Sequence, residues 1–360
     1  MEMTISLCMI VKNEEDVLGR CLESAKGIVD EIIIVDTGSK DRTKEIAQKY
    51  TDCIYDFAWI DDFSAARNFS FQKATKEYIM WLDADDVIEE ADREQLFTLK
   101  KTTQPDTDII MLPYHTAFDE WGNVTMSYFR ERIIRRGANF SWGEPIHEVI
   151  VPSGKIVYGE PAITHRKEKG NEPGRNLAIY RKRIATGSTL SPRGQYYFGR
   201  ELYYNNLFEE AVPVFTAFLE EGKGWVEDSI AACKLLSACY IALRQMQKGE
   251  QVLYQSFCYD LPRGEVLCEI GKVYVDGGQY ERAIYWLEQA LTAKQGQQGF
   301  VYHDYYGYYP HIWLCVCYDK IGNVEKANWH NEQAALLKPG AKEVVHNREY
   351  FRKTLGKIPQ

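Results

Sequence analysis

The sequence predicts an α/β domain over residues 1–175, followed by an all-α domain over residues 176–360. In the first part, short apolar runs typical of buried strands alternate with amphipathic patterns typical of helices. From about Asn176 onward the strand patterns stop, and one helical pattern follows another. Alternating strands and helices predict a Rossmann-like, mixed and mainly parallel sheet, which binds its ligand at the carboxyl ends of the strands.

Apolar runs of strand length and stretches of helical periodicity give the order of elements in the first domain. The expected strands are TISLCMIV (4–11), EIIIVD (31–36), CIYDF (53–57) and EYIMWLD (77–83). The expected helices cover residues 14–26, 42–50 and 63–76, and a further helix begins near Glu89. Residues 108–165 contain shorter strand patterns and turns, so we interpret them as the mixed, loop-rich second half of the same domain.

Small residues recur at equivalent points of the second domain. The positions are 211, 249, 283 and 327, at steps of 38, 34 and 44 residues. This spacing resembles tetratricopeptide repeats (TPRs), whose unit has about 34 residues. The longest step requires an insertion, for which GQQGFVYHDYYGYY (296–309) is the natural candidate. The alternative is an irregular helical bundle, but small residues at fixed points favour repeats, because closely packed helix pairs require them.

Composition and charge argue against several classes of protein. The formal net charge is −9 and the basic residues are scattered, which argues against nucleic acid as a partner. The nine cysteines are odd in number and show no Cys-x-x-Cys pair, so we expect reduced core thiols in a cytoplasmic protein. The chain starts without a basic region, and no window offers about 18 uninterrupted apolar residues, so no transmembrane segment is expected.

Three carboxylates, Asp83, Asp85 and Asp86, end the apolar run MWLDADD. If Asp83 and Asp85 alternate on a strand end, both face one side, where they would repel each other unless a cation lay beside them. Mg²⁺ or Mn²⁺ is the expected cation, because hard cations take oxygen ligands. The alternative is that Asp85 or Asp86 caps the helix that begins near Glu89, which explains one aspartate and not three.

Further polar residues follow the other strands. Asp36 ends the second strand and precedes a Thr-Gly-Ser turn, a pattern suited to holding a nucleobase or ribose, or to a purely structural turn. Asn13 and Glu14 follow the first strand, where Asn13 has the alternative role of capping a helix. Arg67 lies on a helix before the DADD strand and could neutralise a diphosphate or serve as a surface ion-pair partner.

Three segments resemble the N-terminal half of family 2 glycosyltransferases with the GT-A fold: SLCMIVKNEEDVLGRCLES, EIIIVDTGSKDRTKEIA and DDFSAARNFSFQKATKEYIMWLDADD. The resemblance covers about residues 3–90. The repeats behind it are similar to those of repeat-bearing bacterial members, which include peptide glycosyltransferases of the bacteriocin type. The family implies a nucleotide-sugar donor, usually a UDP-sugar. It also implies a divalent metal, Mn²⁺ or Mg²⁺, at the D-x-D motif and inversion at the anomeric carbon.

The resemblance also assigns roles to residues. Asp36 should hold the base, Asp83 should lie near the ribose and metal, and Asp85 should bind the metal directly. The full set expected to bind the nucleotide sugar is Val11, Asn13, Glu14, Asp36, Ser39, Arg67, Asp83, Ala84 and Gly143.

Beyond residue 90, enzymes of this fold place a glycine-containing acceptor loop, an acidic base and a metal-binding histidine. SWGEPIHEVI (141–150) offers Gly143 as the loop glycine and Glu148 as the base, with Asp86 and Glu144 as competitors. An inverting displacement needs such a carboxylate to take the acceptor's proton. His165 is the expected metal-binding histidine, His147 is ambiguous in the same way, and Trp142 either stacks on a sugar or packs in the core.

Three hypotheses about function follow. The first is an inverting, metal-dependent glycosyltransferase whose repeats recruit a peptide, protein or glycan acceptor. The second is a catalytically silent scaffold whose repeats bind a partner protein. The third is an enzyme that acts on a lipid-linked or lipopolysaccharide sugar. The tyrosine-rich insertion either contributes rings to an acceptor surface or forms a homo-oligomer interface.

Overall fold

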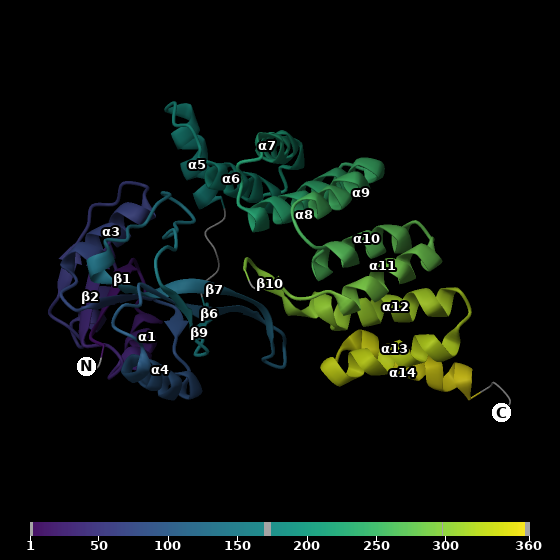
Figure 1. Cartoon of the computed structure of the whole chain (residues 1–360), viewed down its shortest axis with the longest axis horizontal. Helices are drawn as coiled ribbons and strands as arrows, with labels where there is room; N and C mark the ends of the chain where they lie inside the picture. The colour runs from purple at the N-terminus through teal and green to yellow at the C-terminus, as the bar shows by residue number, and fades with distance from the viewer. Residues whose placement is uncertain (1–2, 169–173, 297, 357–360) are drawn as a thin grey trace. The chain divides into compact units, whose positions relative to one another are not determined.

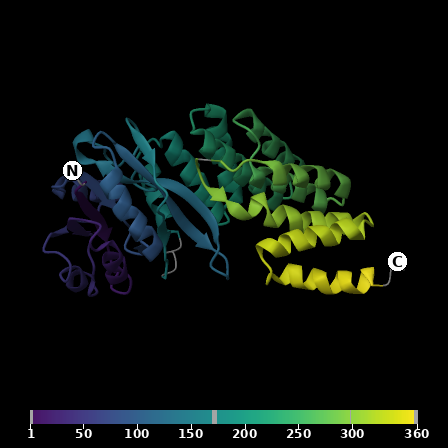
Figure 2. The same ribbon diagram turned by 60° about the horizontal axis from the view of Figure 1, so that its bottom comes forward.

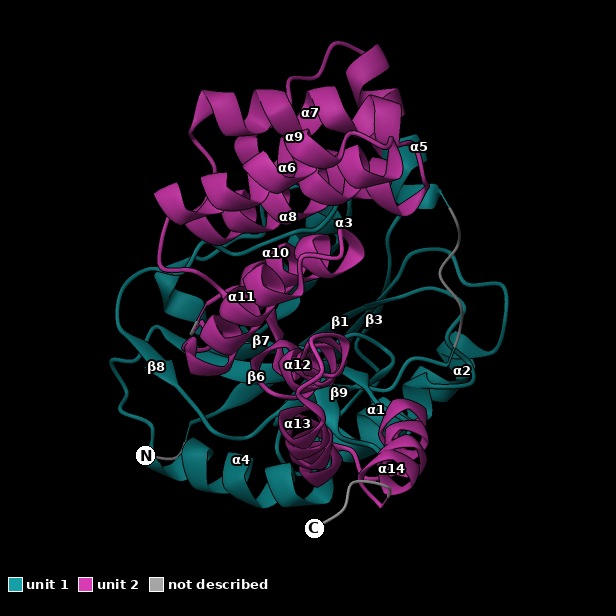
Figure 3. Cartoon of the chain, turned by 90° about the vertical axis from the view of Figure 1, so that its right-hand side faces the viewer, with its two compact units in different colours: residues 1–179 teal, residues 180–360 magenta. Residues whose placement is uncertain are grey.

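The computed structural model describes residues 3–168, 174–296 and 298–356 (Figure 1). The chain divides into two compact units, residues 1–179 and 180–360 (Figure 3). The division falls inside helix α5 (Arg175–Ala185), close to the boundary expected after residue 175. Within the described ranges, no helix is long and apolar enough to cross a membrane.

The first unit contains the expected mixed sheet. Its strands are β1 (Ile5–Val11), β2 (Glu31–Asp36), β3 (Ile54–Asp56), β4 (Tyr78–Trp81), β5 (Asp86–Val87), β6 (Ile109–Phe118), β7 (Val124–Arg135), β8 (Ile156–Tyr158) and β9 (Ile163–His165). They follow the order β3-β2-β1-β4-β7-β6-β9-β5, with β8 beside β6. The pairs from β3 to β4 are parallel, while β7 runs antiparallel to both β4 and β6. The predicted fold class is confirmed.

Helices cover both faces of this sheet because successive residues of its central strands are apolar, so both faces are apolar. The helices are α1 (Leu18–Ala25), α2 (Thr43–Ala47), α3 (Phe63–Lys73) and α4 (Glu90–Thr102), with a 3₁₀ turn η1 (Arg136–Ala138). Met9 of β1 joins a core with Leu22 of α1 and Leu96 of α4. Its neighbour Cys8 joins a second core with Phe71 of α3 on the opposite face. Helix α3 therefore lies on the other face of the sheet from α1 and α4.

Helix α1 begins later than the sequence pattern predicts. Its first residue is Leu18 and its N-cap is Val17, so Asn13 does not cap it. Asn13 has φ +57°, in the left-handed region, and its Oδ1 accepts a hydrogen bond from the Lys40 amide at 2.8 Å. The Asn13 amide in turn donates to Ser39 Oγ at 2.9 Å. Asn13 thus ties the loop after β1 to the loop after β2.

The second unit consists of consecutive antiparallel helix pairs. The helices are α6 (Pro192–Tyr204), α7 (Phe208–Glu221), α8 (Val226–Ala242), α9 (Met246–Gln255), α10 (Gly264–Asp276), α11 (Tyr280–Thr292), α12 (Tyr308–Lys320), α13 (Val324–Leu337) and α14 (Lys342–Leu355). Short elements η2 (Ser256–Cys258), β10 (Val301–Tyr302) and η3 (His303–Tyr306) lie between them. The last helices, yellow in Figure 2, pack side by side.

The predicted small positions lie where paired helices approach most closely. Ala211, Gly249, Ala283 and Ala327 are all buried and lie on α7, α9, α11 and α13, the second helices of the four pairs. In the third pair, a Cβ atom at Gly271 would stand 2.7 Å from Leu287 Cγ. This arrangement confirms the repeat prediction, and the irregular-bundle alternative is wrong.

Two tyrosines of the expected insertion, Tyr305 and Tyr306, pack against helix α10 of their own unit. Tyr305 donates a hydrogen bond to Glu269 at 3.1 Å, and Tyr306 donates one to Glu265 at 2.9 Å. Both acceptors lie on α10. The tyrosine rings are therefore fixed by internal hydrogen bonds, and their role toward an acceptor or a second copy stays a prediction.

Gly271→Val should lower the free energy of unfolding of the helical unit by about 1–3 kcal/mol, because the new side chain overpacks Leu287. Urea denaturation followed by circular dichroism measures this change. Gly277→Val is the matched control on the same helix pair, since a Cβ there would meet its nearest neighbour at an ordinary 3.4 Å. Equal stability of the two variants would contradict close packing at Gly271.

Candidate active site

The polar segments after β1, β2 and β4 meet at one edge of the sheet. These strands are parallel neighbours, and Val11 at the end of β1 lies opposite Asp36 at the end of β2. The Val11 side chain is buried in the core, while its carbonyl accepts a hydrogen bond from the Thr37 amide at 2.9 Å. Only the backbone of Val11 is therefore directed to the strand-end loops.

Asp36 offers one oxygen atom to a ligand. Its side chain is buried, and Oδ1 accepts hydrogen bonds from the Gly38 and Ser39 amides, each at 2.9 Å. Oδ2 is also buried and has no hydrogen-bond partner among the described residues. Because buried polar atoms are nearly always paired, this oxygen is suited to accept an N–H from a bound molecule. Gly38 has φ +106°, a conformation that glycine allows.

The loop after β1 is held by the loop and helix after β2. The Glu14 amide donates to Thr43 Oγ1 at 2.7 Å, and the Glu14 carbonyl accepts the first backbone hydrogen bonds that lead into α1. Together with the Asn13–Ser39 contact, this places Asn13, Glu14, Asp36 and Ser39 around the same strand ends.

The three aspartates after β4 do not alternate on a strand, because β4 ends at Trp81. They form a tight turn, in which the Asp86 amide donates to the Asp83 carbonyl at 3.0 Å and Asp86 Oδ2 accepts from the Asp83 amide at 3.0 Å. The expectation that Asp83 and Asp85 alternate on a strand end is therefore wrong, because both lie in this turn. Asp83 contacts Arg67, Asp85 lies beside His165, and the Ala84 side chain joins the core.

Asp86 is an internal structural group. It is fully buried, accepts a hydrogen bond from Tyr114 at 2.7 Å and pairs with the equally buried Arg132 at 3.0 Å. The N-cap of α4 is Glu89, which makes no side-chain capping bond, so neither Asp85 nor Asp86 caps this helix. Burial also removes Asp86 from the candidates for a base that must reach an acceptor.

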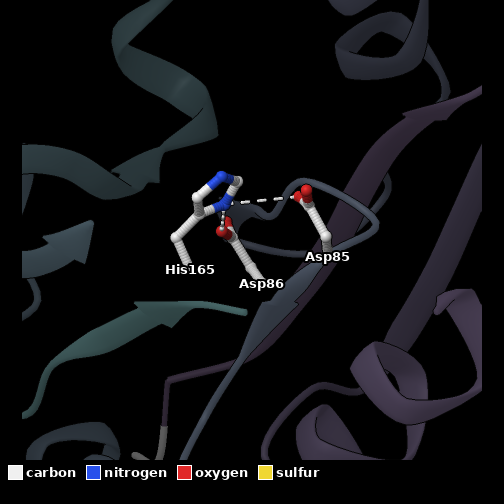
Figure 4. Close-up of side chains that lie close together, drawn as sticks. All are labelled: Asp85, Asp86 and His165. Atoms are coloured by element: carbon white, nitrogen blue, oxygen red, sulfur yellow. Dashed lines mark ion pairs between the residues drawn. The ribbon is translucent and has the colours of Figure 1, made fainter. Parts of the chain in front are cut away.

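Asp85 and His165 lie together at the exposed side of this cluster (Figure 4). His165 Nδ1 is 3.4 Å from Asp85 Oδ1, 3.4 Å from Asp86 Oδ1 and 3.0 Å from the Tyr114 hydroxyl. The β5–β9 pairing creates this contact, because Asp86 and His165 are register partners. The side chains of Asp85 and His165 keep 26% and 22% exposure.

This cluster fits a divalent cation. One ligand atom from each of Asp85, Asp86 and His165 lies within 4.8 Å of the others. Burial raises the pKa of Asp85, and the charges of Asp83 and Asp86 raise it further, so the ionised carboxylate lacks a sufficient counter-charge. Carboxylate oxygen with imidazole nitrogen suits Mn²⁺ or a similar ion. His147 belongs to no such group within the described part of the chain.

Arg67 joins the aspartate turn to the loop at residues 142–149. Its Nη2 donates to Asp83 Oδ1 at 2.6 Å, and its Nε donates to Glu148 Oε1 at 2.7 Å. The side chain is only 8% exposed, so the surface ion-pair alternative is wrong. Burial alone would raise the pKa of Asp83, but Arg67 and Arg132 outweigh it and lower that pKa to about 2.

Two indole rings enclose the Arg67 guanidinium. Its carbon lies 4.9 Å from the Trp81 ring centre and 4.8 Å from that of Trp142, within cation–π range. Trp142 is buried and meets Trp81 edge to face at 4.9 Å. Trp142 therefore packs in the core and does not stack on a sugar.

The loop that carries Glu148 is strained and closed. Gly143 and Val149 exchange backbone hydrogen bonds at 2.8 and 3.1 Å. Glu144 and His147 between them have φ angles of +64° and +53°, which are costly for residues with a Cβ and persist only where the surroundings enforce them. The Glu148 side chain keeps 14% exposure beside Arg67.

Sequence reasoning missed the residues of β7 and β6 that support this site. Arg132 lies between the Trp81 ring at 3.8 Å and the Tyr114 ring at 4.2 Å, and Arg130 lies 4.7 Å from Trp81. The sequence pattern that could have found these arginines is the alternation in FRERIIRR. In it, Arg130 and Arg132 share one face of a strand that is otherwise apolar at its end.

Comparison with known proteins identifies the first unit. Residues 6–154 match the model of Glycosyl transferase family 2. A TPR repeat-containing protein of Synechococcus elongatus is 39% identical over 148 residues, which cover 41% of this chain and 35% of the relative. The SPbeta prophage-derived glycosyltransferase SunS of Bacillus subtilis is 24% identical over 267 residues, covering 70% of this chain and 61% of SunS.

Two further matches each cover about half of the chain. The lipopolysaccharide core biosynthesis glycosyltransferase LpsC of Rhizobium meliloti is 27% identical over 43% of this chain and 60% of LpsC. A TPR protein of Thermus thermophilus is 17% identical with a TM-score of 0.36, over 50% of this chain and 89% of that structure. This chain thus spans between 35% and 61% of the length of these three curated relatives. Residues 6–154 form a glycosyl transferase family 2 domain, which a unit of TPR-like helix pairs follows in the chain.

Proposed function

We propose that this protein is an inverting, metal-dependent glycosyltransferase that moves a sugar from a nucleotide sugar, in the first instance a UDP-sugar, to an acceptor. One observation supports this most. The ends of three adjacent strands in a family 2 domain bring together an unpartnered carboxylate oxygen of Asp36, the Arg67 ion pairs and the Asp85–His165 pair. A silent scaffold would have no need to keep these groups together.

The donor nucleotide is proposed to lie over the ends of β1, β2 and β4. Asp36 Oδ2 would accept an N–H of the base, while the loop that Asn13 and Ser39 fix would border it. Asp83 would face the ribose, held in its ionised form by Arg67. Glu14, Gly143 and the backbone of Val11 and Ala84 complete the proposed lining.

Asp85 and His165 are proposed to hold the divalent metal, Mn²⁺ or Mg²⁺, with Asp86 fixing the turn from inside. A bound cation of this kind neutralises the charge that develops on the departing nucleoside diphosphate. Arg132 and Tyr114 hold Asp86 and thereby keep the Asp85 carboxylate beside the imidazole of His165.

Glu148 is the proposed base. In the transfer, the acceptor nucleophile forms a bond to the anomeric carbon as the bond to the diphosphate oxygen breaks, and the nucleophile's proton passes to the Glu148 carboxylate. Arg67 holds one oxygen of this carboxylate through Nε. Of the competitors, Asp86 is buried, and Glu144 remains an alternative on the same loop.

The acceptor is proposed to be a peptide, protein or glycan that the helical repeats recruit. The similarity to SunS extends over 70% of this chain, which is more than the family 2 domain alone. A lipopolysaccharide sugar is the second candidate, because LpsC is named for lipopolysaccharide core biosynthesis.

UDP should raise the melting temperature of the wild type only when Mn²⁺ or Mg²⁺ is present, and GDP should do so less. Asp36→Asn should weaken UDP binding by about 10- to 100-fold, because it removes the acceptor oxygen of a charge-assisted hydrogen bond. Differential scanning fluorimetry measures the melting temperature, and isothermal titration calorimetry measures the affinity for UDP. If no nucleotide binds to the wild type with either metal, the donor proposal fails.

Asp85→Asn and Asp86→Asn should separate metal binding from stability. Asp85→Asn should remove Mn²⁺ binding without destabilising the metal-free fold, because it deletes a carboxylate whose pKa burial and neighbouring aspartates already raise. Asp86→Asn should lower the free energy of unfolding by about 3–5 kcal/mol, because it leaves the Arg132 charge buried and unpaired. Electron paramagnetic resonance of Mn²⁺ and chemical denaturation measure the two effects, and reversed results would contradict these roles.

Glu148→Gln should lower kcat for hydrolysis of the UDP-sugar by about 10²- to 10⁴-fold, the usual contribution of a general base. UDP affinity should stay unchanged, since the glutamine carbonyl can still accept the hydrogen bond from Arg67. Glu144→Gln is the control on the same loop. If the Glu144 variant loses turnover and the Glu148 variant keeps it, the base is Glu144.

A further inference from the structure

Asn68, which follows Arg67 on α3, binds the backbone of the loop that carries Glu148. Its Nδ2 donates to the Trp142 carbonyl at 2.9 Å, and its Oδ1 accepts from the Trp142 amide at 2.8 Å. The side-chain amide thus satisfies both backbone groups of one residue, as a neighbouring strand would do. A second tether lies close by, where the Phe63 amide at the start of α3 donates to the Pro145 carbonyl at 2.8 Å.

The loop needs such external support. Residues 143–149 are closed by the exchange of hydrogen bonds between Gly143 and Val149. Two of its residues, Glu144 and His147, hold left-handed conformations that cost on the order of 1–3 kcal/mol each. Strain of this size persists only where surrounding contacts fix the backbone, and Asn68 contributes two of those contacts at the entrance of the loop.

The Asn68 side chain does not belong to the buried core that α3 forms with the sheet. The buried core on that face of the sheet includes Phe71 and Ala74, whereas Asn68 is half-buried and polar. Its hydrogen bonds end on the loop backbone, while those of Arg67 end on the carboxylates of Asp83 and Glu148. Arg67 therefore holds carboxylate side chains of the site, and the next residue, Asn68, holds the main chain of the loop.

We propose that Asn68 is a positioning residue that fixes the main chain at Trp142 and, through the loop 142–149, the place of the Glu148 carboxylate. This inference rests on the proposed function, in which Glu148 acts on the acceptor side. Among the described residues, the side-chain hydrogen bonds of Asn68 end on Trp142 and not on Asp36, Asp83 or Asp85, so its loss should lower turnover and leave nucleotide binding intact.

Asn68→Asp is the test variant, because it keeps the size and the acceptor oxygen but replaces the donor to the Trp142 carbonyl with a second acceptor. Gln72→Glu is the matched control, since it makes the same amide-to-acid change at an exposed position of the same helix. Hydrogen exchange measured by mass spectrometry should show faster exchange in Asn68→Asp, confined to peptides within residues 140–150. The Gln72 variant should exchange as the wild type does.

Turnover and binding measurements complete the test on the full chain. Whichever of UDP-glucose and UDP-N-acetylglucosamine the wild type hydrolyses serves as donor, and UDP with Mn²⁺ serves as the binding probe. Asn68→Asp should lower kcat at least 10-fold, with KM and UDP affinity within about 2-fold of wild type. Wild-type exchange in the loop, wild-type kcat, or loss of the whole cooperative unfolding transition would each overturn the inference. Absence of UDP binding by the wild type would instead refute the proposed function, while the exchange result would still decide the role of Asn68 in the loop.

Discussion

The double ion pair of Arg67 is the contact on which the rest of the site depends. One guanidinium binds Asp83, which follows a central strand, and Glu148, which lies on a distant loop, at 2.6 and 2.7 Å. Two half-buried carboxylates near each other would otherwise repel. The faces of Trp81 and Trp142 further compensate the desolvated cation through their negative π-surfaces. Without the Arg67 cation, the turn that carries Asp83 and the loop that carries Glu148 would lose the ion pairs that hold them together.

The carboxylates of the site are not all matched by a positively charged side chain. The excess negative charge lies at Asp85, where a metal cation is proposed. Asp83 and Glu148 share Arg67, and Asp86 has Arg132. Among the described residues, the ion-pair partner of Asp85 is His165, and burial raises the pKa of Asp85. The buried pairs of Asp86 and the ion pair of Asp83 fix the turn on which Asp85 lies. A bound divalent ion would relieve a repulsion that the fold itself creates.

The sequence predicted the strand ends well, because apolar runs that stop abruptly at polar residues mark where parallel strands leave a core. Asp36 and Asp85 were predicted in this way, whereas His165 was predicted from the resemblance to family 2 glycosyltransferases. The conformation of Asn13 was missed, because a left-handed residue that bonds to the next loop leaves no trace in hydrophobic periodicity. The role of Asp86 was missed for a different reason. Its partners Tyr114 and Arg132 lie 28 and 46 residues away in sequence, and the sheet pairings among β5, β9, β6 and β7 bring them to it.

The two sides of the site are built by different physical means. The proposed donor side consists of short loops at the ends of parallel strands, which the sheet hydrogen bonds and the apolar core hold in place. The proposed acceptor side is one strained loop that α3 holds through Arg67, Asn68 and the Phe63 amide. Substitutions within residues 143–147 can therefore change the surface that faces the proposed donor and leave the loops at the strand ends undisturbed. The fixed elements on that side are Trp142, Glu148 and the Pro145 carbonyl, because each makes a hydrogen bond or ion pair through which α3 sets the loop's position.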